Sequence, residues 1–171
     1  MRIAVLTVSD RAARGERPDA SGPALCARLK RAALRVVQTA VLPDEPPQIE
    51  AQRRDWADGG EVDVILTTGG TGIAARDRTP EATLSVCERT VPGIGEVMRQ
   101  AGLAKTPHAM LSRGVAGVRG RTLIVNLPGS PRAAVECLEA VLPALPHAVE
   151  LLSGSPEAEA GHRRPPGAVA V

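Results

Sequence analysis

The stretch Glu61-Val-Asp-Val-Ile-Leu-Thr-Thr-Gly-Gly-Thr-Gly-Ile-Ala-Ala-Arg-Asp-Arg-Thr-Pro80 decides the fold. It opens on a short apolar run rich in β-branched residues, Val62 to Leu66, which predicts a buried strand. The run breaks into Thr67-Thr68-Gly69-Gly70-Thr71-Gly72, which cannot pack a core. Thr79-Pro80-Glu81 then supplies an N-cap, a proline at the first helical position and an acid in the first turn. The stretch therefore predicts a strand, a glycine loop and a helix in succession.

The glycine loop is suited to bind an anion, because glycines let backbone N–H groups turn toward a ligand without a Cβ in the way. The loop lacks the lysine of a P-loop. Gly70-x-Gly72-x-x-Ala75 fits the dinucleotide fingerprint formally, but that fingerprint requires the helix to begin within the glycines, and here it begins near Thr79. A glycine-rich connection without a ligand is the remaining alternative.

Apolar runs and helical patterns alternate along the rest of the chain, which predicts an α/β fold with right-handed crossovers. The expected class is a three-layer, mostly parallel central sheet flanked by helices, with a small antiparallel hairpin element. The hairpin joins residues 114–118 to 122–125 through Arg119-Gly120. We expect further strands over residues 3–8, 34–42 and 62–66, and helices over residues 21–33, 48–57, 80–89, 95–103, 131–142 and 145–152. Ser21 and Ser130 are the expected caps of their helices, residues 12–20 are expected to form a loop, and Pro92-Gly93 is expected to end the helix over 80–89. In the helix over 48–57, Ile49, Arg53 and Trp56 share one face.

The length and composition favour one domain with an aliphatic core. The chain has 171 residues, which suits a single domain over residues 1–153, and the non-periodic segment 154–171 predicts a flexible tail. Trp56 is the only aromatic residue, and we expect it to pack on a helix face. A formal charge of +2 and the missing aromatic platforms argue against nucleic acid as a partner.

The sequence also indicates a cytoplasmic protein. Cys26, Cys87 and Cys137 are far apart and form no CxxC pair, which is typical of reduced, buried thiols. No apolar run reaches the length of a membrane span, and the first residues do not have the pattern of a signal peptide.

Four strand ends carry polar chemistry that crossover topology would place along one rim: residues 9–11, 43–45, 67–77 and 126–130. Arg11, Arg76, Arg78 and Arg113 would favour a phosphate there. Asp44 and Asp77 would repel a phosphate unless Mg²⁺ lies between them. The residues alone thus predict a Mg²⁺-assisted phosphate or nucleotide enzyme. Each acid also has an alternative role without a metal. Asp44 could be an acid at the start of a helix, and Asp77 could solvate the loop.

Six motifs in order resemble the Mog/MoaB family of molybdenum-cofactor biosynthesis, whose members are similar to molybdopterin adenylyltransferases. The resemblance spans roughly residues 1–153. The motifs are Val8-Ser-Asp-Arg11, Leu42-Pro-Asp-Glu45, the loop 67–80, Pro92-Gly-x-Gly-Glu96, Met110-Leu-Ser-Arg113 and Asn126-Leu-Pro-Gly-Ser-Pro131. It implies a molybdopterin-binding-like fold and Mg²⁺-dependent transfer of AMP from ATP to the terminal phosphate of molybdopterin, which prepares the product for molybdate.

The resemblance and the rim together assign site residues. Asp44 and Asp77 match the family's two essential acids and are expected to be catalytic and to hold the metal. The expected nucleotide and phosphate contacts are Ser9, Asp10, Arg11, Thr68, Gly69, Gly70, Thr71 and Gly72. The expected molybdopterin contacts are Ser112, Arg113, Pro128, Gly129 and Ser130.

The resemblance further implies a homotrimer or homohexamer and a molybdate-inserting enzyme as a partner. One departure is chemical: without Phe or Tyr, the pterin would be held by hydrogen bonds and aliphatic walls. Two other function classes stay open. One is a catalytically silent, MoaB-type molybdopterin-binding protein, and the other is a nicotinamide-dependent oxidoreductase.

Overall fold

The structure is a computed structural model that describes residues 1–154. Its strands are β1 Arg2–Val8, β2 Arg35–Leu42, β3 Val64–Thr68, β4 Arg89–Thr90, β5 Ala116–Arg119 and β6 Thr122–Leu127. Its α-helices are α1 Asp10–Ala13, α2 Ser21–Arg31, α3 Pro46–Asp58, α4 Thr79–Leu84, α5 Pro92–Leu103, α6 Pro131–Val141 and α7 Leu145–Ser153. Two short 3₁₀ helices, η1 Pro107–Leu111 and η2 Leu142–Ala144, complete the described fold.

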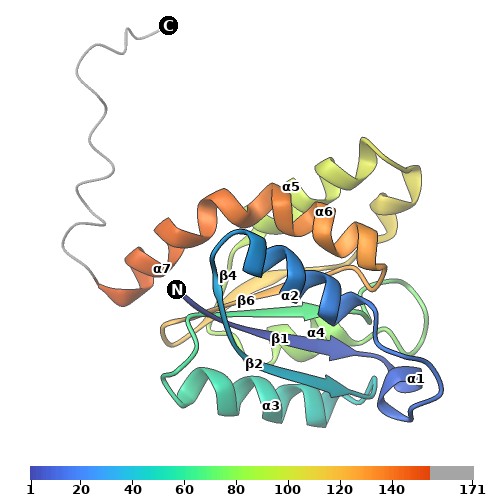
Figure 1. The fold of residues 1–171 in the computed structure, drawn as a ribbon, viewed down its shortest axis with the longest axis horizontal. Helices are drawn as coiled ribbons and strands as arrows, with labels where there is room; N and C mark the ends of the chain where they lie inside the picture. The colour runs from blue at the N-terminus through green and yellow to red at the C-terminus, as the bar shows by residue number, and fades with distance from the viewer. Residues whose placement is uncertain (155–171) are drawn as a thin grey trace, which may run out of the picture.

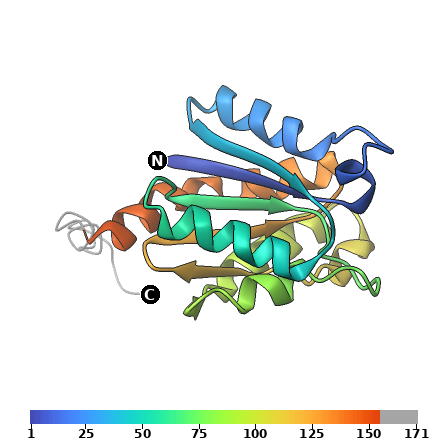
Figure 2. The same ribbon diagram turned by 90° about the horizontal axis from the view of Figure 1, so that it is seen from below.

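The strands form one six-stranded sheet in the order β2-β1-β3-β6-β5-β4. The pairs β1–β2, β1–β3 and β3–β6 are parallel, whereas β5–β6 and β4–β5 are antiparallel. Helices cover both faces, with α2 and α6 on one side and α3 on the other (Figures 1 and 2). The three-layer, mostly parallel sheet with a small antiparallel part is therefore confirmed.

Two apolar clusters fill the space between the layers. Alternate residues of β1 point to opposite faces: Ile3 and Val5 pack with α2, α5, α6 and α7, while Ala4 and Leu6 pack with α3 and α4. Trp56 is buried in the second cluster, as its helical spacing predicts. Since both faces of β3 and β6 are covered, every residue of these two strands is buried, rather than every second one.

Several predicted boundaries are wrong. The helix predicted over 80–89 ends at Leu84, and Arg89–Thr90 is an edge strand beside β5. Pro92 begins α5 instead of breaking a helix, since a proline fits the first turn, where its missing N–H is not needed. Residues 10–13, predicted as mostly loop, form the short helix α1. The hairpin turns at Gly120-Arg121, one residue later than predicted.

The predicted helix caps also need correction. Asp19, not Ser21, caps α2, because its Oδ1 accepts from the amides of Ser21 and Gly22 at 3.0 and 3.1 Å. Thr79 is the first residue of α4 and makes no side-chain capping bond. Ser130 precedes α6 at the capping position, but its side chain makes no capping bond either.

The cysteines are free, and burial raises the pKa of the Cys87 and Cys137 thiols to about 11, so both stay protonated near neutral pH. Within residues 1–154, no helix is long and apolar enough to span a bilayer. The predicted tail lies outside the described residues, apart from Gly154, which ends α7 in a left-handed conformation.

Candidate active site

The carboxyl ends of the parallel strands meet at one edge of the sheet, beside α1 (Figure 1). The chain passes from β1 outward to β2 and then returns to β3 on the other side of β1, so the strand order reverses between β1 and β3. Such switch points form crevices in open α/β sheets. Here the crevice is a cleft of about 450 Å³, which we name the acidic cleft. Its polar lining residues are Thr7, Ser9, Asp10, Arg11, Arg14, Arg17, Asp19, Ser21, Asp44 and Asp77.

Asp44 lies in the acidic cleft directly after β2 and is locked to Asp10 after β1. The Asp10 amide donates to the Asp44 carboxylate at 2.9 Å, and the Asp44 amide donates to the Asp10 carboxylate at 3.0 Å. Burial raises the pKa of Asp44, and the nearby carboxylates of Asp10 and Asp77 raise it further. Asp44 is thus a partly buried acid without an ion-pair partner within residues 1–154.

Asp77 reaches the same cleft from the end of the glycine loop. Its Oδ2 accepts from the Ala74 amide at 2.9 Å, which fixes the carboxylate against its own loop. A Cβ on Gly72 would lie 2.8 Å from that oxygen, and a Cβ on Gly70 would lie 3.0 Å from Oδ1 of Asp44. The two predicted acids therefore face one glycine loop and line one cleft, as the rim argument requires.

The glycine loop is hydrogen-bonded to the end of β6, and neighbouring atoms leave no room for a side chain at Gly69 or Gly70. Gly69 and Gly70 have positive φ angles of +103° and +62°. The Gly69 amide donates to the Leu127 carbonyl at 3.2 Å, and the Thr68 hydroxyl donates to the Pro128 carbonyl at 2.6 Å. The loop is consequently fixed to the end of β6, and the dinucleotide pattern is excluded because α4 begins seven residues after Gly72.

Arg113 braces the glycine loop from outside. Its amide donates to the Thr71 carbonyl at 2.8 Å, and its Nε donates to the Gly72 carbonyl at 2.7 Å. Its guanidinium also donates to the Asp77 carbonyl and pairs with Glu81, which lowers the pKa of that carboxyl. Arg113 therefore holds both ends of the segment that carries Asp77.

Arg76 closes the other side of the loop. Its guanidinium donates to both carboxylate oxygens of Asp10 at 2.9 and 3.0 Å and to Glu45 at 2.9 Å. The bidentate bond lowers the pKa of Asp10. Asp10 follows β1 and Glu45 follows β2, so these bonds from Arg76 tie the glycine loop to the ends of both strands.

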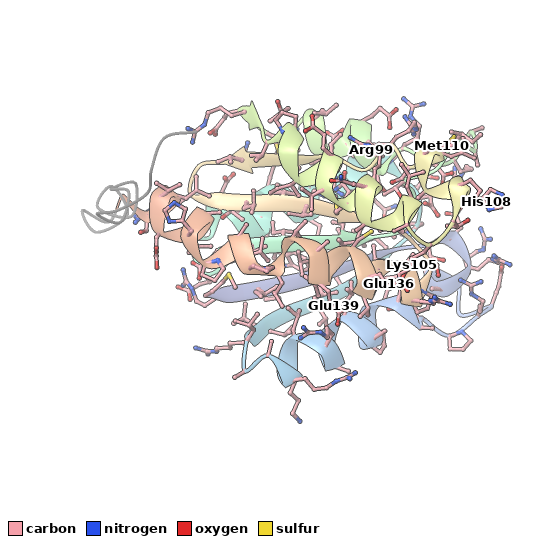
Figure 3. The ribbon with its side chains drawn as sticks, turned by 90° about the horizontal axis from the view of Figure 1, so that it is seen from above. Arg99, Lys105, His108, Met110, Glu136 and Glu139 are labelled. Atoms are coloured by element: carbon pink, nitrogen blue, oxygen red, sulfur yellow. The ribbon has the colours of Figure 1, made fainter. Side chains whose placement is uncertain are left out.

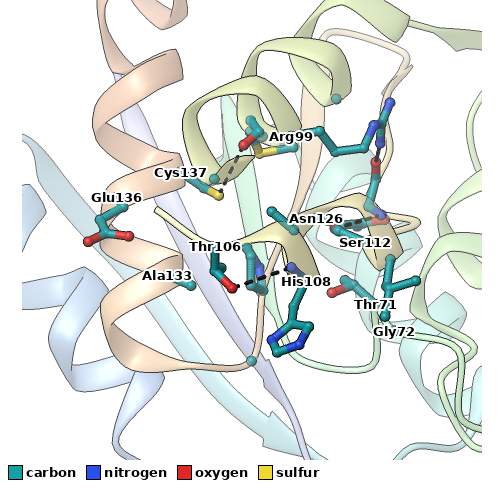
Figure 4. A pocket seen from close by; sticks show the side chains of 18 of the residues that line it. Thr71, Gly72, Arg99, Thr106, His108, Ser112, Asn126, Ala133, Glu136 and Cys137 are labelled. Atoms are coloured by element: carbon teal, nitrogen blue, oxygen red, sulfur yellow. Dashed lines mark hydrogen bonds between the residues drawn. The ribbon is translucent and has the colours of Figure 1, made fainter. Parts of the chain in front are cut away.

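A second cleft of about 340 Å³ lies on the other side of the glycine loop, between α5, η1 and α6. Its walls are mostly apolar, and Thr71, Gly72, Ser112, Pro128 and Gly129 are among the lining residues. Figure 4 shows it from close by, with Ser112 and Thr71 on one side and Cys137 on the other. Figure 3 labels four polar residues around it that are not among the predicted site residues: Arg99, Lys105, His108 and Glu136. We name it the apolar cleft; Gly129 lines both clefts.

Comparison with known proteins places this geometry in a family. The model described as "Probable molybdopterin binding domain" matches residues 4–147. The chain belongs to the molybdopterin-binding domain family. A protein from Helicobacter pylori J99 named molybdopterin adenylyltransferase is 45% identical over 157 residues, which cover 91% of this chain and 89% of that protein. An Escherichia coli K12 protein of the same name is 40% identical, with 90% and 86% covered. The crystal structure of the molybdopterin biosynthesis enzyme MoaB from Thermus thermophilus is 57% identical over 91% of this chain and 98% of that one, with a TM-score of 0.85.

The predicted site residues of this molybdopterin-binding domain fall into three groups. Ser9, Asp10, Arg11, Asp44, Gly69, Gly70 and Asp77 line the acidic cleft, and Thr71, Gly72, Ser112, Pro128 and Gly129 line the apolar one. Thr68 is buried beneath the loop. Arg113 and Ser130 line neither cleft, and Arg113 is occupied with bracing.

Asp19 lies in the candidate site, and sequence reasoning missed it. It lines the acidic cleft, caps α2 and accepts from the Thr7 hydroxyl at 2.7 Å. The spacing Asp19-x-Ser21-Gly22-Pro23 is a capping signal that could have indicated its position, because an acid before a helix start with proline in the first turn favours an N-terminal cap.

Proposed function

We propose that this chain is a molybdopterin adenylyltransferase of molybdenum-cofactor biosynthesis. A terminal phosphate oxygen of molybdopterin attacks the α-phosphorus of ATP, a new P–O bond forms, and the bond to the β-phosphate breaks to release pyrophosphate. The adenylylated product is then ready for molybdate insertion. The observation that carries the proposal is the meeting of Asp44 and Asp77 in one cleft, across a glycine loop at the switch point of the sheet.

The two clefts suit the two substrates. The acidic cleft offers the amides of the glycine loop and the cation Arg11 to the triphosphate. The apolar cleft offers aliphatic walls and a few polar groups, including Ser112, to a pterin. Because Gly129 and the glycine loop border both clefts, a phosphate from each substrate can approach the other there. Transfer of this kind depends on positioning and electrostatics rather than on a protein nucleophile.

The donor set fits Mg²⁺. Residues 1–154 hold no group of three or more acidic, histidine or cysteine side chains arranged for a metal ion. Mg²⁺ is typically bound by one or two carboxylates together with substrate phosphates and water, and Asp44 and Asp77 supply that number. The bound ion would neutralise phosphate charge. Asp44 and Asp77 would hold it, while the bond from Ala74 keeps the Asp77 carboxylate oriented.

The assay of this function is pyrophosphate release from purified protein with ATP, molybdopterin and Mg²⁺. We expect turnover that stops when EDTA removes the metal and returns when Mg²⁺ is added in excess, because the carboxylates and phosphates repel one another without a cation. Molybdopterin binding without any release of pyrophosphate would instead support the alternative of a catalytically silent molybdopterin-binding protein.

The braces around the loop give a second prediction. Arg113→Gln is expected to lower kcat/KM about 10- to 100-fold, the usual cost of losing a residue that orients a ligand of the metal. Arg119→Gln is the matched control, since Arg119 also pairs with an acid, Asp58, far along the sheet from both clefts. The measurement is the steady-state kcat/KM of the two variants. Equal values for Arg113→Gln and Arg119→Gln would show that Arg113 does not position Asp77.

We further propose that the protein works in the cytoplasm as a homotrimer or homohexamer and passes its product to a molybdate-inserting enzyme. An interface between copies would cover exposed apolar side chains such as Ile73 and Met110, which are 69% and 62% accessible. Sedimentation equilibrium measures the number of chains.

A further inference from the structure

Arg53 is a charged residue in the interior of the domain. It lies in α3 between Ile49 and Trp56, on the face that packs against the sheet, and its side chain is fully buried. Its Nη1 donates to the Thr79 carbonyl at 3.3 Å, while its Nε and Nη2 have no hydrogen-bond partner within residues 1–154. No carboxylate of this part of the chain forms an ion pair with it. Burial lowers its pKa to about 9.

This arrangement lowers the stability of the fold. A buried guanidinium without a counter-ion loses its hydration and recovers little of it through a single long hydrogen bond. An apolar side chain of similar length could occupy this buried position, between Ile49 and Trp56 on α3, without that penalty. Since Arg53 does not stabilise the fold, its role is expected to lie in the one hydrogen bond that it makes, to the Thr79 carbonyl.

The acceptor, Thr79, is the residue on which the glycine loop rests. The Thr79 amide donates to the Gly70 carbonyl at 3.1 Å. The Thr79 hydroxyl, itself buried and without a partner among the described residues, lies 2.3 Å from where a Cβ on Gly70 would stand. The Asp44 carboxylate lies 3.0 Å from that same point. Gly70 is thus enclosed between Thr79 and the first of the two predicted acids.

The Thr79 carbonyl is also held from the other side. Thr83 donates to it at 2.9 Å, and Asn126 donates to Thr83 and to Thr67 at 2.8 Å each. These hydrogen bonds form one buried network. It connects α3, the start of α4, β6 and β3, beneath the glycine loop that separates the two clefts. Arg53 is its only charged member within residues 1–154.

We propose that Arg53 is a positioning residue for the glycine loop, acting through Thr79 on Gly70. The hydrogen bond to the Thr79 carbonyl fixes the first turn of α4. That turn then fixes Gly70, through the Thr79 amide, and Asp77, which lies two residues before Thr79 in the chain. The consequence for ATP binding rests on the proposed function, whereas the consequence for the order of the loop does not.

The test compares Arg53→Met with Arg54→Met. Arg54 is the next residue of the same helix, is exposed and pairs with Glu50, so its replacement removes the same charge without touching the network. Three quantities are measured: the thermal midpoint, amide hydrogen exchange across residues 67–83, and binding of Mg·ATP by calorimetry. R53M is expected to keep or raise the midpoint, to speed exchange in the loop at least tenfold, and to weaken Mg·ATP binding about tenfold or more. R54M is expected to match the wild type.

The outcomes separate this inference from the proposed function. Unchanged loop exchange in R53M, with a wild-type midpoint, overturns the inference even if the protein is an active adenylyltransferase. Faster loop exchange in R53M, together with a wild-type protein that binds no Mg·ATP, supports the inference and removes the proposed function. If R53M does not fold, Arg53→Lys decides, since an ammonium can still donate to the Thr79 carbonyl: slow exchange, like that of the wild type, supports the role, and fast exchange without loss of the midpoint contradicts a role for that bond.

Discussion

Asp77→Asn is expected to lower pyrophosphate release about 10²- to 10³-fold, and Asp44→Asn to do the same. Each change keeps the size of the side chain and removes the charge that a Mg²⁺ ion needs. Asparagine can still accept from the Ala74 amide at position 77 or the Asp10 amide at position 44, so the local backbone bonds survive. The loss therefore reports on charge rather than on folding.

The control for both variants is Asp58→Asn, which removes an equal charge from an exposed pair with Arg119. We expect it to retain activity. Thermal unfolding supplies a second control: D44N is expected to be no less stable than the wild type, because burial already disfavours the ionised carboxylate of Asp44. Normal turnover by both D44N and D77N would end the assignment of these acids.

The fold could be predicted because its strongest signals are local. Apolar runs of β-branched residues separated by helical patterns specify a parallel sheet covered on both faces. The errors arise where tertiary contacts override local pattern. Thr67 and Thr68 read as loop residues, yet both are buried in β3, where their hydroxyls donate to carbonyls of neighbouring segments. The predicted helix reaches Arg89, but α4 ends at Leu84, and pairing with β5 makes Arg89–Thr90 a strand.

The convergence of Asp44 and Asp77 could also be predicted, since carboxyl ends of parallel strands share one edge of a sheet. The partners of the arginines could not. The sequence predicts that Arg113 faces a ligand, yet it points back to the loop and Glu81, which lies 32 residues earlier in the chain. Helical spacing places Arg53 correctly on the face of Ile49 and Trp56, but its contact with Thr79 depends on how α3 packs beside α4. Side-chain partners of this kind are set by packing and carry no spacing signal.

Gly69→Ala is expected to have the largest effect on stability among single substitutions in the loop. Gly69 has a φ of +103°, and an added Cβ would lie 2.1 Å from the Val8 carbonyl oxygen at the end of β1. Gly129 packs on its other side, with a would-be Cβ 3.2 Å from the Gly69 α-carbon. The methyl group can be accommodated only if β1 and β3 separate at the switch point.

The expected cost of Gly69→Ala is about 3 kcal/mol or more, from backbone strain and a clash with main-chain atoms. For a domain of this size that lowers the thermal midpoint by roughly 6–12 °C. Gly60→Ala is the matched control: Gly60 also has a positive φ, +72°, but nothing lies within 4 Å of its added Cβ. It should lose only about 1–2 kcal/mol, the conformational cost alone. Denaturant unfolding gives the free energy of unfolding of each variant, and the difference between them separates the steric clash from the backbone strain. Equal losses of that free energy would show that Gly69 is not enclosed between β1 and Gly129. Because the collision opens the wall of the acidic cleft, G69A should also lose pyrophosphate release at temperatures where it is still folded, while G60A keeps it.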